Sequence, residues 1–234
     1  MHKALTYEQT GDLALLKMDD GRANALDPSL LRALQEALRR AEKEAQAVVL
    51  SGREDRFCAG FDLAVFRQGG PEAVRNMVAA GAELALQIAR HPAPVVIACT
   101  GHALAMGAVL LCAADLRIGT AGDFKIGFNE VAIGMVAPRF LAEFARERLS
   151  KRHLQRAVVQ TEIYTPKDAL DAGFLDRVVA PEALAAVAQE AARRLAGLPR
   201  PAFLGTRKLL RGEVLDRIEA TLAEDRTSSP LAPS

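Results

Sequence analysis

One stretch of the chain, residues 95–114, contains no Asp, Glu, Lys or Arg. Its first five residues, Val95–Cys99, are mostly β-branched or small and follow two prolines, a pattern that predicts a buried strand. From Ala105 onward the stretch is rich in Ala and Leu and predicts a buried helix that ends before Asp115. The run is long enough to cross a bilayer, but Thr100, Gly101 and His102 interrupt it where the pattern changes. We therefore expect a strand, a tight turn at Gly101 and a helix whose N-terminus presents unpaired N–H groups.

The hydrophobic pattern before this stretch alternates between strands and helices. Asp27-Pro28 predicts a helix start, with Asp27 as N-cap, and Leu30, Leu31, Leu34 and Leu38 repeat at helical spacing after it. The other expected elements are strands at 13–18 and 48–52 and a long helix from Pro71 to about Arg90. Strand, helix and strand in succession predict an α/β core with crossover connections.

After residue 114 the pattern predicts a strand at 115–120, helices at 139–149 and 151–159, a short helix that ends at Gly173 and a strand at 174–179. Pro181 opens an amphipathic helix with Leu184, Val187 and Leu195 on one face, and we expect this face to be buried against another subunit. Two further helical segments follow a linker at 198–201, and the tail at 227–234 is expected to be disordered. We therefore divide the chain into a core, residues 1–181, and a C-terminal helical oligomerisation segment, residues 182–234.

Composition narrows the functional classes. The chain has 234 residues, 50% of them hydrophobic, and a net charge of +1, so no strong field attracts nucleic acid or an anionic membrane. The start of the sequence lacks the apolar core of an export signal, and two of the three cysteines lie in apolar stretches, which indicates a reducing, cytoplasmic setting. The four histidines show no metal-ligand spacing, so we expect no metal site.

Two further segments carry candidate chemistry. Gly60 lies in a run of small residues, 57–63, which indicates tight backbone geometry or simply a turn into a helix. Glu130 is the lone carboxylate of an apolar segment, 126–138. Such a carboxylate either points to solvent or has a raised pKa suited to acid–base chemistry.

Four segments, in the same order along the chain, resemble the crotonase (enoyl-CoA hydratase/isomerase) superfamily: residues 57–63, 100–107, 112–118 and 169–179. Residues 129–140 are more similar to the Δ3,Δ2-enoyl-CoA isomerases than to the hydratases. The resemblance implies an α/β fold, the crotonase/ClpP-like spiral of ββα units, with C-terminal helices for oligomerisation as a homotrimer or a dimer of trimers. It also implies an acyl-CoA thioester substrate, with coenzyme A as part of the substrate rather than a separate cofactor, and a place in fatty acid β-oxidation.

The resemblance also assigns residues. It places the backbone N–H groups of Phe61 and Met106 around the thioester oxygen as an oxyanion hole, and it matches Glu130 to the acid–base glutamate of the family. It implies that the substrate is bound by Ala23, Ala25, Ala59, Gly60, Asp62, Leu63, Ala64, Gly107 and Val109. Many members have glycines where Ala105 and Met106 stand, so Met106 is expected to need unusual dihedrals.

Hydratases of the family carry a second glutamate where this sequence has Val109. We therefore expect an isomerase in which Glu130 moves a proton from C2 to C4 through a dienolate held in the oxyanion hole. The alternatives are a hydratase that uses Glu130 alone, another crotonase-type reaction on an acyl-CoA, or a non-catalytic acyl-CoA-binding or assembly protein. A competing interpretation of Val109 is that it only fills core space, and that a second acid is supplied from elsewhere, such as Glu143.

Overall fold

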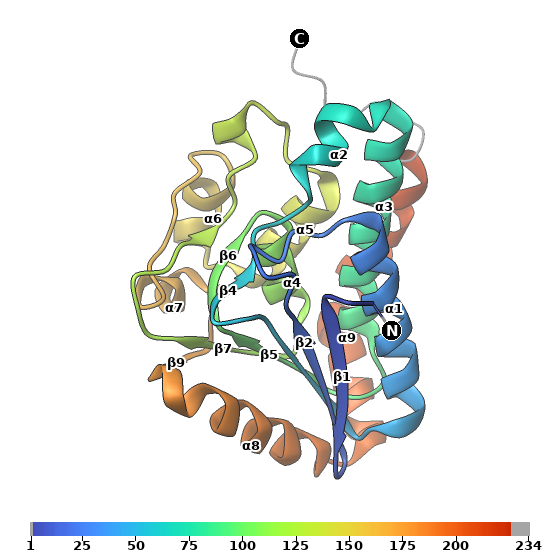
Figure 1. Ribbon diagram of the computed structural model, residues 1–234. Coiled ribbons are helices and arrows are strands. Elements are labelled where there is room, and N and C mark those ends of the chain that lie inside the picture. The colour runs from blue at the N-terminus through green and yellow to red at the C-terminus, as the bar shows by residue number, and fades with distance from the viewer. Residues whose placement is uncertain (1, 226–234) are drawn as a thin grey trace.

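The computed structural model describes residues 2–225, in which the chain passes back and forth between two sheets. The larger sheet contains β3 (Ala47–Ser51), β5 (Val95–Cys99) and β7 (Leu116–Thr120). The smaller sheet contains β4 (Asp55–Cys58), β6 (Gly101–Leu104) and β8 (Ile126–Gly127). Each of these strands of the larger sheet is followed in the chain by one of the smaller sheet, and helices then lead to the next pair (Figure 1). This repeat is the expected spiral of ββα units, so the predicted fold class is confirmed.

Three more strands complete the larger sheet, whose order is β1-β2-β3-β5-β7-β9. β1 (Leu5–Thr10) and β2 (Leu13–Met18) form an antiparallel hairpin, whereas the other pairs, out to β9 (Arg177–Val179), are parallel. The sequence pattern missed β1 because only Leu5 is buried in that edge strand, so no apolar run marks it.

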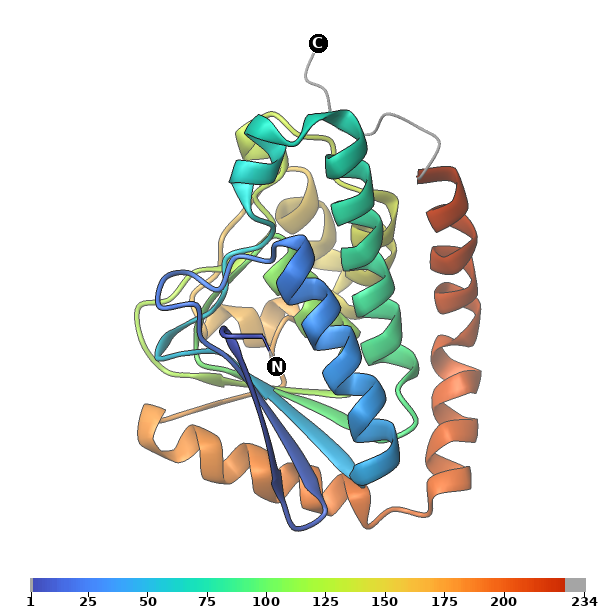
Figure 2. The same ribbon diagram turned by 45° about the vertical axis from the view of Figure 1, so that its right-hand side comes forward.

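The larger sheet is covered on both faces. Val49, Val96 and Ile118 pack on α8 (Leu184–Ala196), while Leu50 and Ile97, on the opposite face, belong to the main core. Figure 2 shows α8 on one side of the sheet and α1 (Pro28–Glu44), α3 (Gly70–Arg90) and α9 (Arg200–Asp225) on the other. Burial on both faces explains why β3 and β5 are nearly continuous apolar runs.

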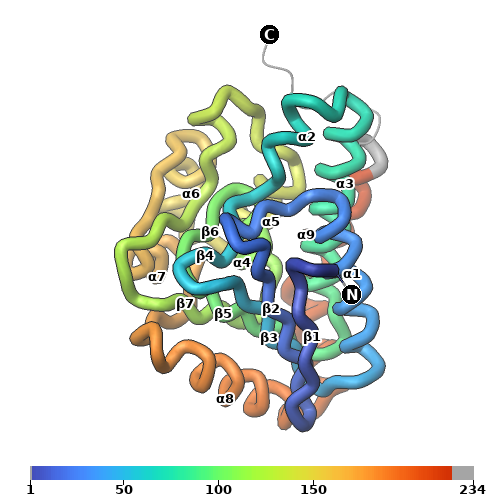
Figure 3. Tube along the Cα trace, in the orientation of Figure 1, coloured from blue at the N-terminus to red at the C-terminus, as the bar shows by residue number. Residues whose placement is uncertain are grey.

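α8 corrects one expectation. Leu184 is buried together with Ala188, Ala191 and Ala192 against the sheet of its own chain. The tube trace shows this helix passing beneath the sheet between β9 and α9 (Figure 3). The prediction that this apolar face needs another subunit for its burial is therefore wrong, because the spiral leaves one face of the sheet open and α8 fills it.

The remaining helices agree with the sequence pattern except at the C-terminal end and at the short helical turn Val131–Ile133, which was not predicted. α1 begins where predicted, with Asp27 Oδ1 accepting hydrogen bonds from the amides of Ser29 and Leu30, both at 2.7 Å. The other helical segments are α2 (Leu63–Gln68), α4 (Met106–Ala113), η1 (Val131–Ile133), α5 (Arg139–Arg148), α6 (Lys151–Val158), α7 (Asp168–Ala172) and η2 (Pro181–Ala183).

α9 is one helix of 26 residues, not the two segments that were expected. It packs against α3 and α5, and Arg90 of α3 forms ion pairs with Asp216 and Glu219, both at 2.7 Å. Ile218 is fully buried in this contact layer. The tail at 227–234, predicted to be disordered, lies outside the described residues.

The apolar stretch that dominates the sequence is more divided than its pattern indicated. Gly101 does not end the strand region but bends the chain into β6, which joins the smaller sheet beside β4. A Cβ at Gly101 would lie 2.1 Å from the Asp55 carbonyl oxygen, so only glycine permits this approach. Within residues 2–225 no helix has both the length and the apolar character to span a membrane.

Candidate active site

A cavity of about 100 Å³ lies where α2, α3, α4 and α5 meet the segment around η1. Its walls are almost entirely apolar. They are formed by Ala59, Phe61, Leu63, Phe66, Val78, Ala105, Met106, Val109, Asn129, Glu130, Ile133, Met135, Pro138, Phe140 and Leu141. Phe61, Met106, Val109 and Glu130, which the sequence analysis placed in one site, thus line one cavity.

Two backbone amides in this wall have no acceptor among residues 2–225. Phe61 forms a parallel bridge with Leu26, but the bonds of that bridge use the Gly60 carbonyl (2.8 Å) and the Asp62 amide (3.1 Å). Met106 is the first residue of α4, so its N–H precedes the hydrogen-bond ladder of the helix. Both N–H groups are available to a ligand, and that of Met106 lies at the positive end of the helix dipole.

Glycine brings these two amides close together. Gly60, directly before Phe61, has φ +97°, and a Cβ on it would lie 2.8 Å from Ala105 Cβ and 3.4 Å from the Met106 nitrogen. Gly107 has a similar effect within α4, because a Cβ there would lie 2.3 Å from the Cys58 carbonyl oxygen. The loop after β4 can therefore touch the start of α4, as the small residues in both segments indicated.

The unusual dihedrals fall on Ala105 rather than on Met106. Ala105 is the N-cap of α4, with φ 50° and ψ −121°, a conformation that residues other than glycine rarely adopt. Its carbonyl accepts the amides of Ala108 and Val109 at 3.0 and 3.1 Å and so begins the helix. The backbone is strained one residue before the predicted donor, and Met106 itself is helical.

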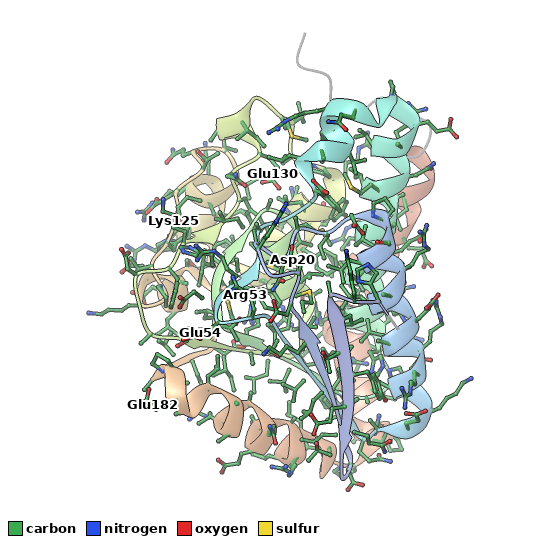
Figure 4. The ribbon with its side chains drawn as sticks, viewed as in Figure 1. Asp20, Arg53, Glu54, Lys125, Glu130 and Glu182 are labelled. Carbon is green, nitrogen blue, oxygen red and sulfur yellow. The ribbon has the colours of Figure 1, made fainter. Side chains whose placement is uncertain are left out.

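Glu130 is buried, with 8% of its surface exposed, and its Oε2 atom has no hydrogen-bond partner among residues 2–225. Burial raises the pKa of this carboxyl from 4.5 to about 7, although the backbone amides of Glu130 and Asn129 partly offset the effect. Figure 4 places Glu130 close to α2. Of the two interpretations of this lone carboxylate, the structure supports the buried group with a raised pKa.

Glu130 is the one titratable side chain among the described residues that line the cavity. Val109, at the position of the second glutamate of hydratases, is buried and apolar. Glu143, considered above as a second acid, does not line the cavity; its carboxylate pairs with Arg146 and with Arg217, whose Nε lies 3.5 Å away. The cavity wall therefore offers a single carboxylate from the described residues.

Of the other predicted substrate-binding residues, Ala59 and Leu63 also line the cavity, whereas Ala23, Ala25, Gly60, Asp62, Ala64 and Gly107 are not part of its wall. The Ala59 amide donates to the Ala23 carbonyl at 3.1 Å, which joins the loop that carries Ala23 and Ala25 to the loop after β4. Asp62 is the N-cap of α2 and accepts the Ala64 amide at 2.8 Å. Their contacts with substrate remain predictions.

Sequence reasoning missed Asn24, which fixes the loop between β2 and α1. This fully buried residue has φ 53°, and its Nδ2 donates to the carbonyls of Met18, Arg56 and Phe57 at 3.0–3.1 Å. The signal was present in the sequence, because asparagine between small residues is typical of a left-handed turn.

Sequence reasoning also missed Phe140, Leu141 and Asn129 as cavity residues. The helical pattern of α5 marked the two apolar side chains only as buried. The Asn129 Oδ1 atom is buried without a hydrogen-bond partner in the described part of the chain. Among residues 2–225, no group of three or more His, Cys, Asp or Glu side chains is placed to hold a metal ion.

Comparisons with known proteins agree with this arrangement. A profile of the enoyl-CoA hydratase/isomerase family matches residues 8–228. The crystal structure of a member of this family from Pseudomonas syringae superposes with a TM-score of 0.93 at 38% identity, over 97% of this chain and 98% of that one.

Two further relatives carry different activities in their names. A probable enoyl-CoA hydratase from Mycolicibacterium paratuberculosis is 31% identical over 92% of this chain and 84% of its own length. The human mitochondrial Δ3-Δ2-enoyl-CoA isomerase superposes with a TM-score of 0.92 at 25% identity, over 97% of this chain and 90% of its own. By its sequence motifs, its spiral of ββα units and these relatives, the chain belongs to the enoyl-CoA hydratase/isomerase family, the crotonase superfamily.

Proposed function

We propose that this protein is a Δ3,Δ2-enoyl-CoA isomerase that uses Glu130 as its one acid–base group. The observation that carries the proposal is a single buried carboxylate, with its pKa raised to about 7, in an apolar cavity with two unpaired backbone amides among the described residues. A group with a pKa near neutrality can both take and return a proton at physiological pH.

In this mechanism the thioester oxygen accepts hydrogen bonds from the N–H groups of Phe61 and Met106. The Glu130 carboxylate removes a proton from C2, and the electron pair moves through C2–C4 to give a dienolate whose oxygen is stabilised by the two amides. Protonated Glu130 then delivers the same proton to C4, and the double bond comes to lie between C2 and C3. The proton is conserved, and no second reactant is needed.

Val109 supports isomerisation over hydration. Hydration requires a water molecule that is held and deprotonated while a proton is delivered to the neighbouring carbon, and a valine side chain cannot hydrogen-bond to that water. Double-bond migration needs one base and benefits from a dry cavity, which favours the return of the proton to carbon. The human isomerase among the relatives is consistent with this choice.

A hydratase is the second candidate, and one observation favours it. Asn129 Oδ1 and Glu130 Oε2 are both buried acceptors without partners in the described part of the chain, and a water molecule can donate one hydrogen to each of two acceptors. A water molecule held in this way would present a lone pair to the substrate. The alternative outside the enzymes is a protein that binds acyl-CoA at this site without catalysing a reaction.

Product analysis separates these candidates. The protein is supplied separately with a 3-enoyl-CoA and with a 2-enoyl-CoA, and the products are identified by chromatography. We expect rapid conversion of the first into the 2-enoyl isomer, with little 3-hydroxyacyl-CoA from the second. In Glu130→Gln, isomerisation should fall by about 10²–10⁴-fold, the usual contribution of an acid–base group, while acyl-CoA binding persists.

Three outcomes would contradict the proposal. Rapid hydration with little isomerisation would favour the hydratase. Full activity in Glu130→Gln would exclude the mechanism. Binding of acyl-CoA in calorimetry without turnover of either substrate would favour the non-catalytic class.

A further inference from the structure

We infer that Phe140 closes the inner end of the cavity and limits the length of the acyl group that this protein binds. The inference rests on the proposed function in taking an acyl-CoA as the ligand, and it adds a substrate preference and the residue that sets it. The argument depends on the burial of the cavity walls, on what lies behind them and on the size of the space.

The cavity has an open end and a closed end. Leu63 and Ile133 line it and are 46% and 50% exposed, so they mark the opening between α2 and η1. Val109, Phe140 and Leu141 line it and are each only 1% exposed, so they mark the closed end between α4 and α5.

The closed end has a second layer behind it. α5, which carries Phe140, packs between α4 and α9, and on α9 the side chains of Val214, Leu215 and Ile218 are buried. A closely packed protein interior does not yield readily to a longer ligand, because displaced side chains have no space to enter. An acyl chain that reaches Phe140 must therefore stop there or turn back toward the opening.

The space before the closed end is small, about 100 Å³. It must hold the thioester group beside the amides of Phe61 and Met106 as well as the acyl carbons next to that group. A closed space of this kind favours a short acyl group over a long one.

The alternative path leads outward. Val131 and Val136, near the opening, are also exposed, at 45% and 72%, and a long chain could lie across them instead of entering the closed end. Carbons on such a surface stay partly in water and gain less affinity per methylene than buried ones. The two paths therefore predict different dependences of affinity on chain length.

Calorimetric titration with saturated acyl-CoAs of 4 to 16 carbons, all below their micelle concentrations, measures this dependence without requiring turnover. We expect the Kd to fall about 4-fold per added methylene, the factor that corresponds to about 0.8 kcal/mol per buried methylene, and then to level off within this series, at the chain length at which the acyl group reaches Phe140. In Phe140→Ala the levelling point should move to chains longer by roughly two to four carbons, because a phenyl ring fills the space of a few methylenes. Phe140→Leu should give a smaller move in the same direction.

Phe144 provides the matched control. It is a fully buried phenylalanine one turn further along α5, and it does not line the cavity. Phe144→Ala and Phe144→Leu should destabilise the fold to a similar degree and leave the levelling point where it is in the unmodified protein. If the Ala variants do not fold, the two Leu variants and the unmodified protein still decide the question.

The results separate the inference from the proposed function. Two results would overturn the inference and favour the outward path while leaving the isomerase proposal intact. One is an affinity that rises steadily to 16 carbons in the unmodified protein. The other is a levelling point that is the same in Phe140→Ala and Phe140→Leu as in the unmodified protein. No binding of any acyl-CoA would overturn both.

Discussion

Among the described residues that line the cavity, Glu130 has no cation to stabilise its charge, and this connects its chemistry to the stability of the protein. Burial disfavours the carboxylate and raises the pKa of the group from 4.5 to about 7. The folded protein therefore binds the Glu130 proton more tightly than the unfolded chain does. The tighter binding of this proton adds to the free energy of unfolding. This contribution is fully present below about pH 4.5 and is lost as the pH rises toward 7.

Glu130→Gln should consequently make the protein more stable at high pH, since glutamine has nearly the same shape and never acquires a charge. The gain should approach about 3 kcal/mol at pH 8, from roughly 1.36 kcal/mol per pKa unit, and should shrink toward zero near pH 4.5. Urea unfolding of both proteins between pH 5 and 8 measures it, and the difference between the two cancels the titration of other groups. A gain that does not change with pH would show that burial does not raise this pKa.

Val109 is the residue that separates the two candidate reactions. Val109→Glu should add measurable hydration of a 2-enoyl-CoA, because a second carboxylate could hold and deprotonate a water molecule opposite Glu130. The substitution should also lower stability, since Val109 is 1% exposed and a buried carboxyl is costly.

Val109→Gln is the control for this substitution, because it has the length of glutamate but cannot take up a proton. Hydration should be monitored as formation of 3-hydroxyacyl-CoA, and thermal unfolding should establish that both variants are folded. Equal hydration in the two variants, or none in either, would contradict the role assigned to Val109.

At the scale of single residues, the sequence revealed groups whose type is unusual for their surroundings. Glu130 was found because a lone carboxylate in an apolar segment needs an explanation. Phe140 was not found, because a phenylalanine in a helical pattern is equally consistent with any buried position, and only the fold distinguishes the cavity wall from the core around Phe144. Asn24 could have been suspected, but its three carbonyl partners come from two segments that the sequence does not pair.

At the scale of elements, the start of α4 decides whether the site can form. Ala105 holds a conformation that costs an L-residue of order 1–3 kcal/mol, and the structure retains it because Gly60, Gly107 and the bond from the Ala105 amide to the Gly127 carbonyl (3.0 Å) fix the turn. The strain lies next to one of the two proposed oxyanion donors.

Ala105→Gly should stabilise the protein by about 1 kcal/mol, because the relief of strain exceeds the loss of about 0.5–1 kcal/mol from the greater freedom of glycine in the unfolded chain. Isomerase activity should be unchanged, since the Met106 N–H remains in place. Ala108→Gly, within the same helix and with ordinary helical dihedrals, should instead destabilise by about 1 kcal/mol. Denaturant unfolding checks both, and destabilisation by Ala105→Gly would show that the turn is not strained.

The elements that the sequence predicted correctly are those with strong local signals, such as the Asp27 cap of α1 and the long apolar face of α3. It missed β6 because glycine normally ends a strand, whereas Gly101 here allows the chain to approach Asp55 and to continue in another sheet. That approach is a long-range contact, so no local pattern encodes it. The resemblance to a family supplied the two-sheet arrangement that propensity could not.

At the scale of the whole molecule, the large exposed apolar side chains of the C-terminal helices lie on α9 rather than on α8. α8 is covered by the sheet of its own chain, but α9 carries Leu209 and Leu210 with 86% and 79% of their surfaces exposed. Leu210 also lines a groove between α8 and α9, whose lining is partly apolar (Leu195, Leu198, Pro199, Ala202 and Phe203) and partly charged (Asp115, Glu147, Arg148, Arg207 and Arg211). Adjacent exposed leucines of this kind are typical of a surface that another protein covers.

The family resemblance implies a homotrimer or a dimer of trimers, and we expect the protein to form one of these at micromolar concentrations, with Leu209 and Leu210 in the contact between copies. The double variant Leu209→Glu/Leu210→Glu should shift the mass measured by light scattering toward the monomer, because the interface would have to bury two unpaired carboxylates. Its unfolding temperature at high dilution should be close to that of the unmodified protein, since both leucines are mostly exposed in the single chain. Lys208→Glu alters the charge of the same helix without removing an apolar side chain and should leave the mass unchanged. An unmodified protein that scatters as a monomer would rule out this interface, and a double variant that remains a trimer would place the interface elsewhere on the surface.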